Sequence, residues 1–258
     1  MNQYGFGPGS LVAIPKFDAS GNAITNPTPV KFGAVQDVAF DGSWEIKKLY
    51  GRGQFPLAVG RGKGSMTGKL SFAQVNGRLY NSLLFGQTLT AGVDAVYEDF
   101  TGTVIPDTPY AITPTVPNAG TWAADLGVIN LLTGSPMTKI DSAGTPTTGQ
   151  YKVAAGVYTF AAADKGQTVL INFEYTGTST SAAIIDIFNM PMGYCPSFQV
   201  VFTNSFAGGS EMIMLTNCVA TKFAFPTKLD DFTLRSIDFE ACVDPTTNKL
   251  GRIATTAM

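Results

Sequence analysis

Hydrophobic and polar positions alternate with a period of two residues in several parts of the chain. The clearest alternation covers residues 66–72, 169–175, 198–203 and 221–225. Such alternation indicates β-strands that bury one face and expose the other. Short clusters of Gly, Asp, Asn or Ser predict turns between the strands, at positions 18–22, 41–42, 120, 149, 164–166 and 208–209. The pattern therefore predicts a mainly β fold.

One segment has helical spacing instead. Val75, Leu79 and Leu83 recur every fourth residue and would share one face of a helix, which Phe72 would widen. Gly86 is placed to cap the carboxyl end of this helix. We therefore expect one α-helix between Phe72 and Gly86 that flanks the sheets and covers their core.

The chain divides by composition into three parts. Residues 1–90 contain expected strands and the helix, residues 91–192 are richer in Thr, Ala and Gly, and residues 193–258 return to strands with bulky aromatic side chains. A Pro- and Thr-rich stretch from Pro106 to Pro117 is typical of a linker that enters an inserted domain. We expect 1–90 and 193–258 to form one β domain. Residues 91–192 are then either a β-rich insertion or a further part of the same domain.

Charge is distributed unevenly along the chain. The segment from Ile46 to Val93 holds 7 of the 17 basic residues and no acid, whereas the remaining 10 bases stand against 19 acids. Glycines at six positions between 51 and 68, together with Tyr50 and Phe55, indicate a mobile and adhesive arm. Such an arm requires an acidic partner, and another copy of the same protein is one candidate. The basic residues are Lys47, Lys48, Arg52, Arg61, Lys63, Lys69 and Arg78.

The overall charge content is low. Only 14% of residues are charged, against about 25% in typical soluble domains. Since a free monomer normally carries more surface charge to remain dispersed, this composition favours a subunit with much of its surface covered by other subunits. The alternative is a neutral β surface rich in Thr.

Several kinds of chemistry lack the residues that they need. The chain contains no His, which is the commonest general base and metal ligand, and its three Cys form no CxxC pair. The glycine-rich run after Tyr50 lacks the hydroxyl residue that follows Gly-Lys in a phosphate-binding loop, and GxSxG does not occur. The sequence thus predicts no enzyme, no cofactor and no metal site. Nucleic-acid binding by the basic segment remains an alternative, although its bases are dilute and the rest of the chain is acidic.

The chain offers no sign of export or membrane insertion. Its first residues lack the charged start and apolar centre of a secretory signal, and no apolar run approaches the length of a membrane helix. We expect a protein that is made in the cytoplasm and has no membrane partner.

Three segments together resemble a known family. Residues 35–86 read VQDVAFDGSWEIKKLYGRGQFPLAVGRGKGSMTGKLSFAQVNGRLYNSLLFG, and the closing segment reads FAFPTKLDDFTLRSIDFEACVD. The middle contains DLGVINLLTGSPMTKI and GQYKVAAGVYTFAAADKGQTVLINFEYT. These segments are similar to the tail tube (major tail) proteins of long-tailed bacteriophages. In that family a strand leads to a long flexible loop, a returning strand and a helix.

The resemblance implies a fold, a function and partners. Tail tube proteins form hexameric rings that stack into a hollow tube, the conduit for DNA ejection, and each subunit adds strands to a continuous inner β-barrel. The expected fold is tail-tube-type sheets in a β-sandwich or barrel-forming arrangement, with one flanking α-helix and a β-rich, immunoglobulin-like middle insertion. The expected partners are copies of the chain, the tape measure protein and other tail proteins, with DNA only in transit through the lumen. The expected location is the virion tail.

The long loop of the family reaches an adjacent ring. By the resemblance, its residues here form an inter-ring contact loop made of Lys47, Lys48, Tyr50, Arg52, Phe55, Arg61, Lys63 and Lys69. The alternative function is a carbohydrate- or surface-binding β-sandwich module of a virion. Trp122, Tyr151 and Tyr158 in the middle region motivate that alternative.

Overall fold

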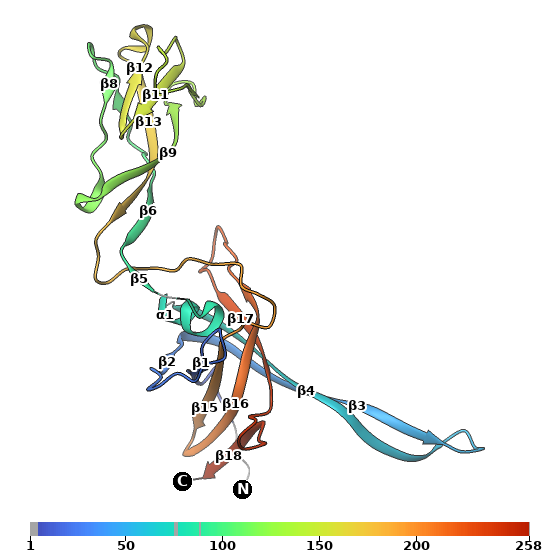
Figure 1. Ribbon diagram of the computed structural model, residues 1–258. Helices are drawn as coiled ribbons and strands as arrows, with labels where there is room; N and C mark the ends of the chain where they lie inside the picture. Colours follow the sequence, from blue (N-terminus) through green and yellow to red (C-terminus); the bar gives the residue numbers. More distant parts are fainter. Residues whose placement is uncertain (1–4, 75–76, 88, 258) are drawn as a thin grey trace. The chain divides into compact units, whose positions relative to one another are not determined.

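The computed structural model describes residues 5–74, 77–87 and 89–257. The chain forms two compact units, each with its own hydrophobic core (Figure 1). Unit 1 comprises residues 1–88 and 185–258, and unit 2 comprises residues 89–184. The insertion was expected at residues 91–192, whereas residues 185–192 belong to unit 1 and residues 89–90 belong to unit 2. Both units are built from sheets whose strands are antiparallel except for the parallel pair β10–β11, so the predicted mainly β fold is confirmed.

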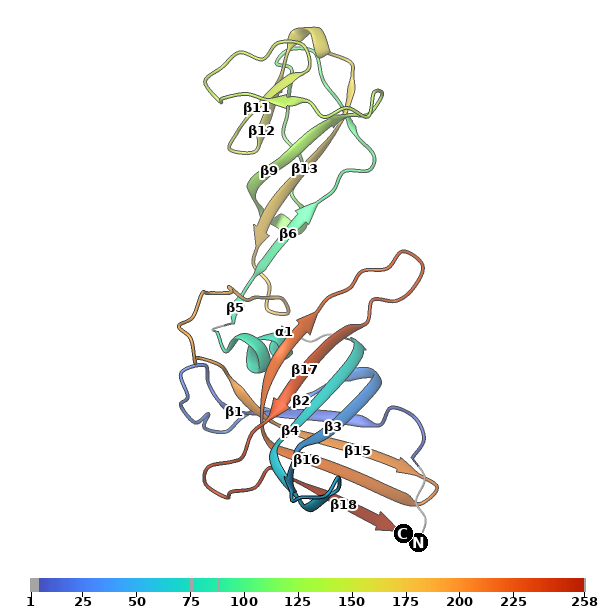
Figure 2. The same ribbon diagram turned by 90° about the vertical axis from the view of Figure 1, so that its right-hand side faces the viewer.

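Unit 1 contains one eight-stranded sheet with the order β2-β1-β15-β16-β17-β4-β3, and β18 also pairs with β16. In Figure 2 the long strands β15 and β16 cross the view below β17 and β4. β3 and β4 are the longest strands, of 18 and 19 residues. The strands are β1 (Ser10–Phe17), β2 (Val30–Lys31), β3 (Gly33–Tyr50), β4 (Pro56–Gln74), β15 (Ser197–Phe206), β16 (Gly209–Ala224), β17 (Arg235–Ala241) and β18 (Gly251–Ala257).

The core of unit 1 follows from the alternation along these strands. Leu70 and Phe72 of β4 and Ile237 and Phe239 of β17 point inward, while their sequence neighbours point to the other face. Gly68 makes room for this packing, because a Cβ atom there would lie 2.2 Å from the Phe239 ring. A larger residue in place of Gly68 would therefore displace the ring.

The helical segment of unit 1 is shorter than the sequence indicated. α1 (Gly77–Tyr80) continues into a π-helical turn, η1 (Asn81–Phe85), which ends at Gly86 in the left-handed conformation. Leu79 and Leu83 are buried against the sheet core. Phe72 was expected on the helix but lies in β4, because strand pairing with β17 extends over it. Val75, also expected on the helix, lies outside the described residues.

Two further expectations were wrong. The predicted turn at Asp41–Gly42 lies inside β3, where Asp41 pairs with Thr67. The glycine serves packing instead, since a Cβ atom there would lie 3.2 Å from the ring of Trp44. Phe225 was placed on a strand, but β16 ends at Ala224 and the Phe225 ring lies exposed under a guanidinium group.

Unit 2 contains two four-stranded sheets and a two-stranded ribbon. One sheet has the order β10-β11-β12-β8, and in the other β13 pairs with β6, β7 and β9. The strands are β5 (Thr90–Ala91), β6 (Val93–Tyr97), β7 (Thr103–Val104), β8 (Ala111–Ile112), β9 (Thr121–Asn130), β10 (Thr138–Lys139), β11 (Gln150–Ala154), β12 (Val157–Phe160), β13 (Thr168–Gly177) and β14 (Ala183–Ile184). Two 3-10 turns accompany them, η2 (Pro117–Ala119) and η3 (Ala162–Asp164).

The core of unit 2 combines side chains from both larger sheets. Val169, Ile171 and Phe173 of β13 are fully buried, and the predicted alternation over 169–175 is confirmed. Tyr151 and Tyr158 from the other sheet pack against this core. Unit 2 therefore buries its own apolar strand faces without help from unit 1.

Candidate docking site on the β3–β4 hairpin

The outer part of the β3–β4 hairpin leaves the sheet as a two-stranded ribbon (Figure 1). β4 pairs with β17 only from Met66 to Phe72, whereas its pairing with β3 continues outward to Pro56. Residues 43–65, which we call the arm, therefore pair only with one another in the described part of the chain. Both long edges of this ribbon are open to solvent.

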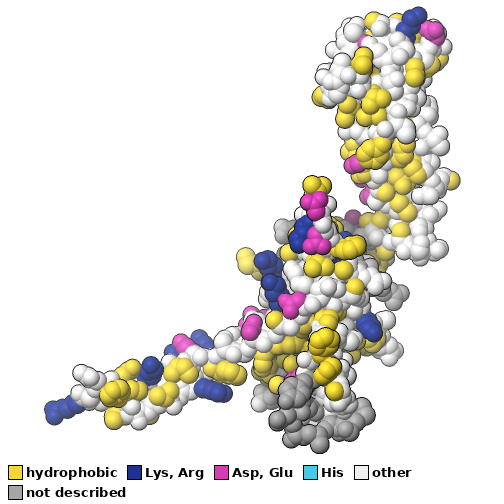
Figure 3. Space-filling model, turned by 180° about the vertical axis from the view of Figure 1, so that it is seen from behind, with side chains coloured by type: hydrophobic (Ala, Val, Ile, Leu, Met, Phe, Trp, Pro, Cys, Tyr) yellow, Lys and Arg dark blue, Asp and Glu magenta, His cyan; other side chains and the backbone are white. Residues whose placement is uncertain are grey.

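The arm exposes an unusual amount of apolar surface. Phe55 is 83% exposed and Leu57 is 75% exposed, and both lie at its outer end. Figure 3 shows hydrophobic and basic side chains mingled along the ribbon. Exposed apolar side chains gathered in this way mark a contact site for another molecule. The exposed apolar residues of the arm are Trp44, Ile46, Leu49, Tyr50, Phe55, Leu57 and Val59.

The arm carries five bases and one acid. Lys47 Nζ lies 2.9 Å from a carboxylate oxygen of Glu45, the acid, and the Arg61 guanidinium lies 4.5 Å from the centre of the Trp44 ring. Contacts between such exposed groups contribute roughly 0–1 kcal/mol each. These two contacts hold side chains on the surface of the ribbon, and only one of the five bases is paired with an acid among the described residues of the arm, so most of the positive charge remains available to a partner.

Seven of the eight residues expected in the contact loop lie on the arm. Lys47, Lys48 and Tyr50 belong to β3, Arg61 and Lys63 belong to β4, and Arg52 and Phe55 lie in the connecting turn. The expected long flexible loop is instead a paired ribbon, and only residues 51–55 connect its strands. The reason is that alternating side chains continue through the basic segment and support strand pairing.

Lys69, the eighth expected residue, is separate from the arm. It lies in the sheet opposite Asp238 of β17 and Ala39 of β3. The face of the sheet on which Lys69 lies also carries Asp41 and Glu240, both exposed. By alternation, these polar residues point away from the core that Leu70 and Phe239 form. The sheet thus has one apolar face and one charged face.

Tyr50 and Phe55 were named from the sequence, but the other five exposed apolar residues of the arm were missed, because the reasoning concentrated on charge. Trp44, Ile46, Leu57 and Val59 are all at least 49% exposed. Their signal in the sequence is the alternation of residues 44–47 and 57–61, which continues the strand pattern into the basic segment. Alternation alone does not tell whether the apolar face lies against the same chain or against another one.

A second apolar surface lies at the base of the arm. It is a groove of about 420 Å³ between the hairpin and the strands β16 and β18. Phe40, Trp44 and Met66 form one wall, and Ile213, Leu250 and Ile253 form the other. We call it the base groove. All of its lining residues belong to unit 1.

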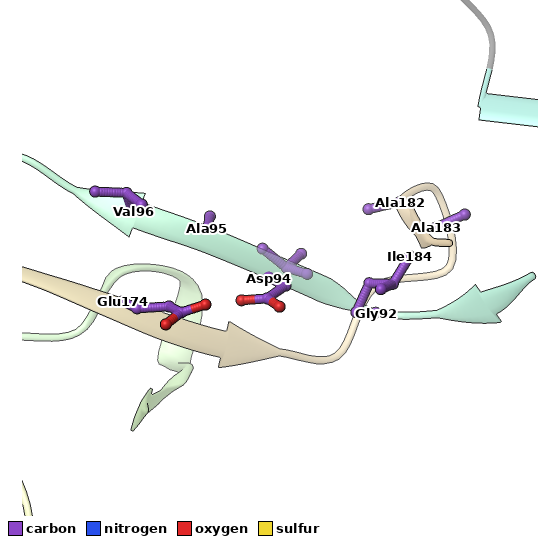
Figure 4. Close-up of a pocket in the computed structure, with 9 residues that line it drawn as sticks. Gly92, Asp94, Ala95, Val96, Glu174, Ala182, Ala183 and Ile184 are labelled. Atoms are coloured by element: carbon purple, nitrogen blue, oxygen red, sulfur yellow. The ribbon is translucent and has the colours of Figure 1, made fainter. Parts of the chain in front are cut away.

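Unit 2 has a pocket lined by two carboxylates (Figure 4). Asp94 of β6 and Glu174 of β13 point toward one another across neighbouring strands. A hydrogen bond with Asp94, together with its charge, raises the pKa of the Glu174 carboxyl. The repulsion between the two charges thus favours the protonated form of Glu174.

The aromatic residues that motivated carbohydrate binding belong to the interior of unit 2. Tyr151 and Tyr158 are 2% and 0% exposed. Trp122 is half-buried, and its Nε1 donates a hydrogen bond to Tyr158 Oη at 3.2 Å. Tyr151 Oη donates to an oxygen of Asp125 at 2.9 Å, and burial raises the pKa of this tyrosine above its usual value. These rings fill a core and offer no exposed platform for a sugar.

Comparison with known proteins gives no family assignment. Within the described residues, no group of three or more His, Cys, Asp or Glu is arranged to hold a metal ion. A search for membrane-crossing helices over the same residues found none of sufficient length and apolarity. No protein-family model matches the chain, and no curated protein matches it. The interpretation of its function therefore depends on the geometry of the arm and the sheet.

Proposed function

We propose that the chain is a structural subunit of a bacteriophage tail tube, which assembles into stacked, hexameric rings that conduct DNA during ejection. The observation that carries this proposal is the arm. Residues 43–65 form a ribbon with two open edges and with apolar side chains up to 83% exposed. An isolated two-stranded ribbon is marginally stable in water, and its open edges favour pairing with another chain.

The sheet of unit 1 is suited to growth by addition of copies. β3 is a terminal strand of this sheet, and β18 pairs with β16 along its first half only. Terminal strands have free hydrogen-bonding groups, and a closed ring of subunits would satisfy them by joining the sheets into a barrel. An arm that contacts the next ring makes a head-to-tail contact, which extends without limit until another protein caps it.

The charged face of the sheet fits the lining of a DNA conduit. In the part of this face that β3, β4, β17 and the second half of β16 form, four acids (Asp37, Asp41, Asp238 and Glu240) lie with two bases, Lys69 and Lys222, so acids are in excess there. A negatively charged wall repels DNA phosphates and lets the nucleic acid pass without adhering. We assign this face to the lumen and the apolar face to the wall of the tube.

The remaining parts of the proposal concern partners and location. The partners are other copies of the chain, the tape measure protein and other tail proteins, with DNA in transit. The protein acts in the virion tail and has a structural, non-enzymatic role. Unit 2, with a core of its own, is a decoration whose removal need not affect the sheet of unit 1.

Electron microscopy of the purified protein tests the proposal. We expect rings or tubes that grow with protein concentration. A charge-reversal variant, Arg61→Glu with Lys63→Glu, should assemble less readily, and the difference should shrink as salt screens the charges. A chain that stays monomeric at high concentration and is absent from phage tails would refute the tail tube function.

A further inference from the structure

The base groove has the form of a binding site that no described residue of unit 1 fills. Ile253 is 66% exposed and Trp44 is 49% exposed, although both line an apolar groove. Its floor is firm, because the ring of Phe40 packs on Phe202 and Phe239 with centroids 5.6 and 6.1 Å apart. A preformed apolar groove with exposed walls gains free energy when another apolar group covers it.

The outer end of the arm cannot reach the groove of its own chain. Tyr50, near the outer end of β3, stands six positions beyond Trp44, which lines the groove. A strand of that length spans roughly 20 Å. Because residues 43–50 are paired with β4 along this distance, the ribbon cannot fold back onto its own base. Any arm that enters the groove therefore belongs to a second copy.

We propose that the base groove of one copy binds the outer end of the arm of a second copy, with Phe55 and Leu57 as the apolar anchors. This inference depends on the proposed self-assembly of the chain. Phe55 and Leu57 are the most exposed large apolar residues of the arm, and a groove of about 420 Å³ has room for two side chains of their size. Fully burying such a pair removes a large apolar area from water.

Charge supports the same pairing. Arg52 lies in the turn of the arm, next to the anchors. Glu211 of β16 lies two positions before Ile213, which lines the groove, so alternation places the carboxylate on the same face of the sheet. Glu211 is exposed and stands opposite Thr255 and Asn204, which are neutral. Since its strand neighbours among the described residues carry no charge, the acid is available to Arg52 of the incoming arm.

The contact has a consequence for assembly. Each copy has one arm and one base groove, and these two surfaces differ. When each arm enters the groove of the next copy, the contact is heterologous and continues from copy to copy, whereas reciprocal exchange of arms between two copies would give a closed twofold dimer. The groove thus identifies the receiving surface of the proposed ring-to-ring contact.

Photo-crosslinking tests the position of the anchor. A benzophenone amino acid at position 55, in mixtures of ¹⁴N- and ¹⁵N-labelled full-length protein, should crosslink between copies to Met66 and Met214, both of which line the groove. The same group at Phe100, which is 82% exposed in unit 2, is the matched control and should give at least tenfold less of this product. Crosslinks from position 55 to the N-terminal segment or to unit 2 of a neighbour would overturn the proposal.

A charge swap tests the orientation of the arm. Arg52→Glu and Glu211→Arg should each raise the concentration needed for assembly about fivefold, as expected for a pair of up to 1 kcal/mol. The double variant should return to within about twofold of the wild type. Additive effects without recovery would overturn the pairing. If the wild type assembles normally but these results fail, only the groove is wrong, whereas a wild type that never assembles refutes the proposed function itself.

Discussion

Two halves of the β3–β4 hairpin differ in what covers their apolar side chains. In the inner half, Val35, Leu70 and Phe72 are buried by the rest of unit 1. In the arm, Ile46 and Leu57 are 52% and 75% exposed, although they belong to the same two strands. The halves are continuous in pairing, with a shift in register between Trp44 and Ile46. The difference arises where β17 stops pairing with β4, at Met66.

Alternation of apolar and polar residues has a different consequence in each half of the hairpin. In both halves alternation favours the strand conformation, because it places apolar side chains on one face of the strand. Only the inner half is covered by its own chain. The arm combines its apolar face with glycines and five bases, a composition that keeps an uncovered ribbon in solution until a partner covers it. Stability of the fold should therefore depend on the inner half, and assembly on the arm.

The largest expected effect comes from truncating a core residue of the inner half. Phe72→Ala removes a ring that is fully buried, so the free energy of unfolding should fall by about 3–5 kcal/mol. Phe55→Ala, on the arm, should change it by less than about 0.5 kcal/mol. Denaturant unfolding of dilute, monomeric protein measures both. Equal losses in the two variants would show that the arm is part of the cooperative core.

A pair of glycines in β4 gives the next largest effect. Gly68→Ala places a Cβ atom against the Phe239 ring, which should cost about 1–3 kcal/mol of stability. Gly60→Ala, the matched variant on the arm, meets no atom within 4 Å and should be neutral or slightly stabilising. Thermal unfolding of the monomers measures the difference. A destabilising Gly60→Ala would indicate that the arm packs against its own chain.

Much of this fold could be predicted from alternation, but its exceptions have physical causes. The strand over 169–175 and the burial of Leu79 and Leu83 follow from periodicity, since each face meets a core in the same chain. Asp41–Gly42 has the composition of a turn, yet pairing with β4 keeps it in a strand. Local propensity was overridden there by tertiary pairing.

The candidate site was predicted only in part. Charge counting found the bases of the arm, because those residues differ from the rest of the chain in composition. Charge counting also assigned Lys69 to the contact loop. In the structure Lys69 lies in the sheet beside Asp238, a neighbour that it gains only when β17 pairs with β4. The base groove could not be predicted, since it joins residues of β3 and β4 to others near 213 and 253. Such contacts depend on strand order, which alternation does not specify.

A smaller effect is expected from the internal contact of the arm. Arg61→Ala removes the guanidinium from the Trp44 ring, an interaction of about 0.5–1 kcal/mol at an exposed site. Hydrogen exchange of the arm amides should accelerate roughly two- to fivefold, with no change in the core of unit 1. Lys63→Ala removes the same charge from the arm without removing that ring contact, and should leave the exchange unchanged. Faster exchange in the sheet as well would mean that arm and sheet open together.

The smallest expected effect is on the stability of unit 2, which has a core of its own and serves as a reference for the changes made in unit 1. The raised pKa of Glu174 means that the folded chain binds this proton more tightly than the unfolded chain does. Stability therefore falls as the pH rises from the ordinary value, 4.5, through the raised pKa, and the loss persists at neutral pH. Glu174→Gln keeps a polar partner for Asp94 and removes the repulsion, so the variant should melt at a higher temperature than the wild type at pH 7 and equally below pH 4.

Trp122 offers a selective probe for this measurement. The chain has two tryptophans, Trp44 on the arm and Trp122 in unit 2, so Trp44→Phe leaves the fluorescence of unit 2 alone. In that background Glu174→Gln should raise the melting temperature of unit 2, and in the wild-type background, which keeps Trp44 in the base groove, it should leave assembly unchanged. Asp186→Asn, which removes an acid of unit 1, is the control and should leave this transition where it was. A Glu174→Gln variant that altered assembly would show that unit 2 contributes to contacts between copies. Assembly would then depend on unit 2 as well as on the arm.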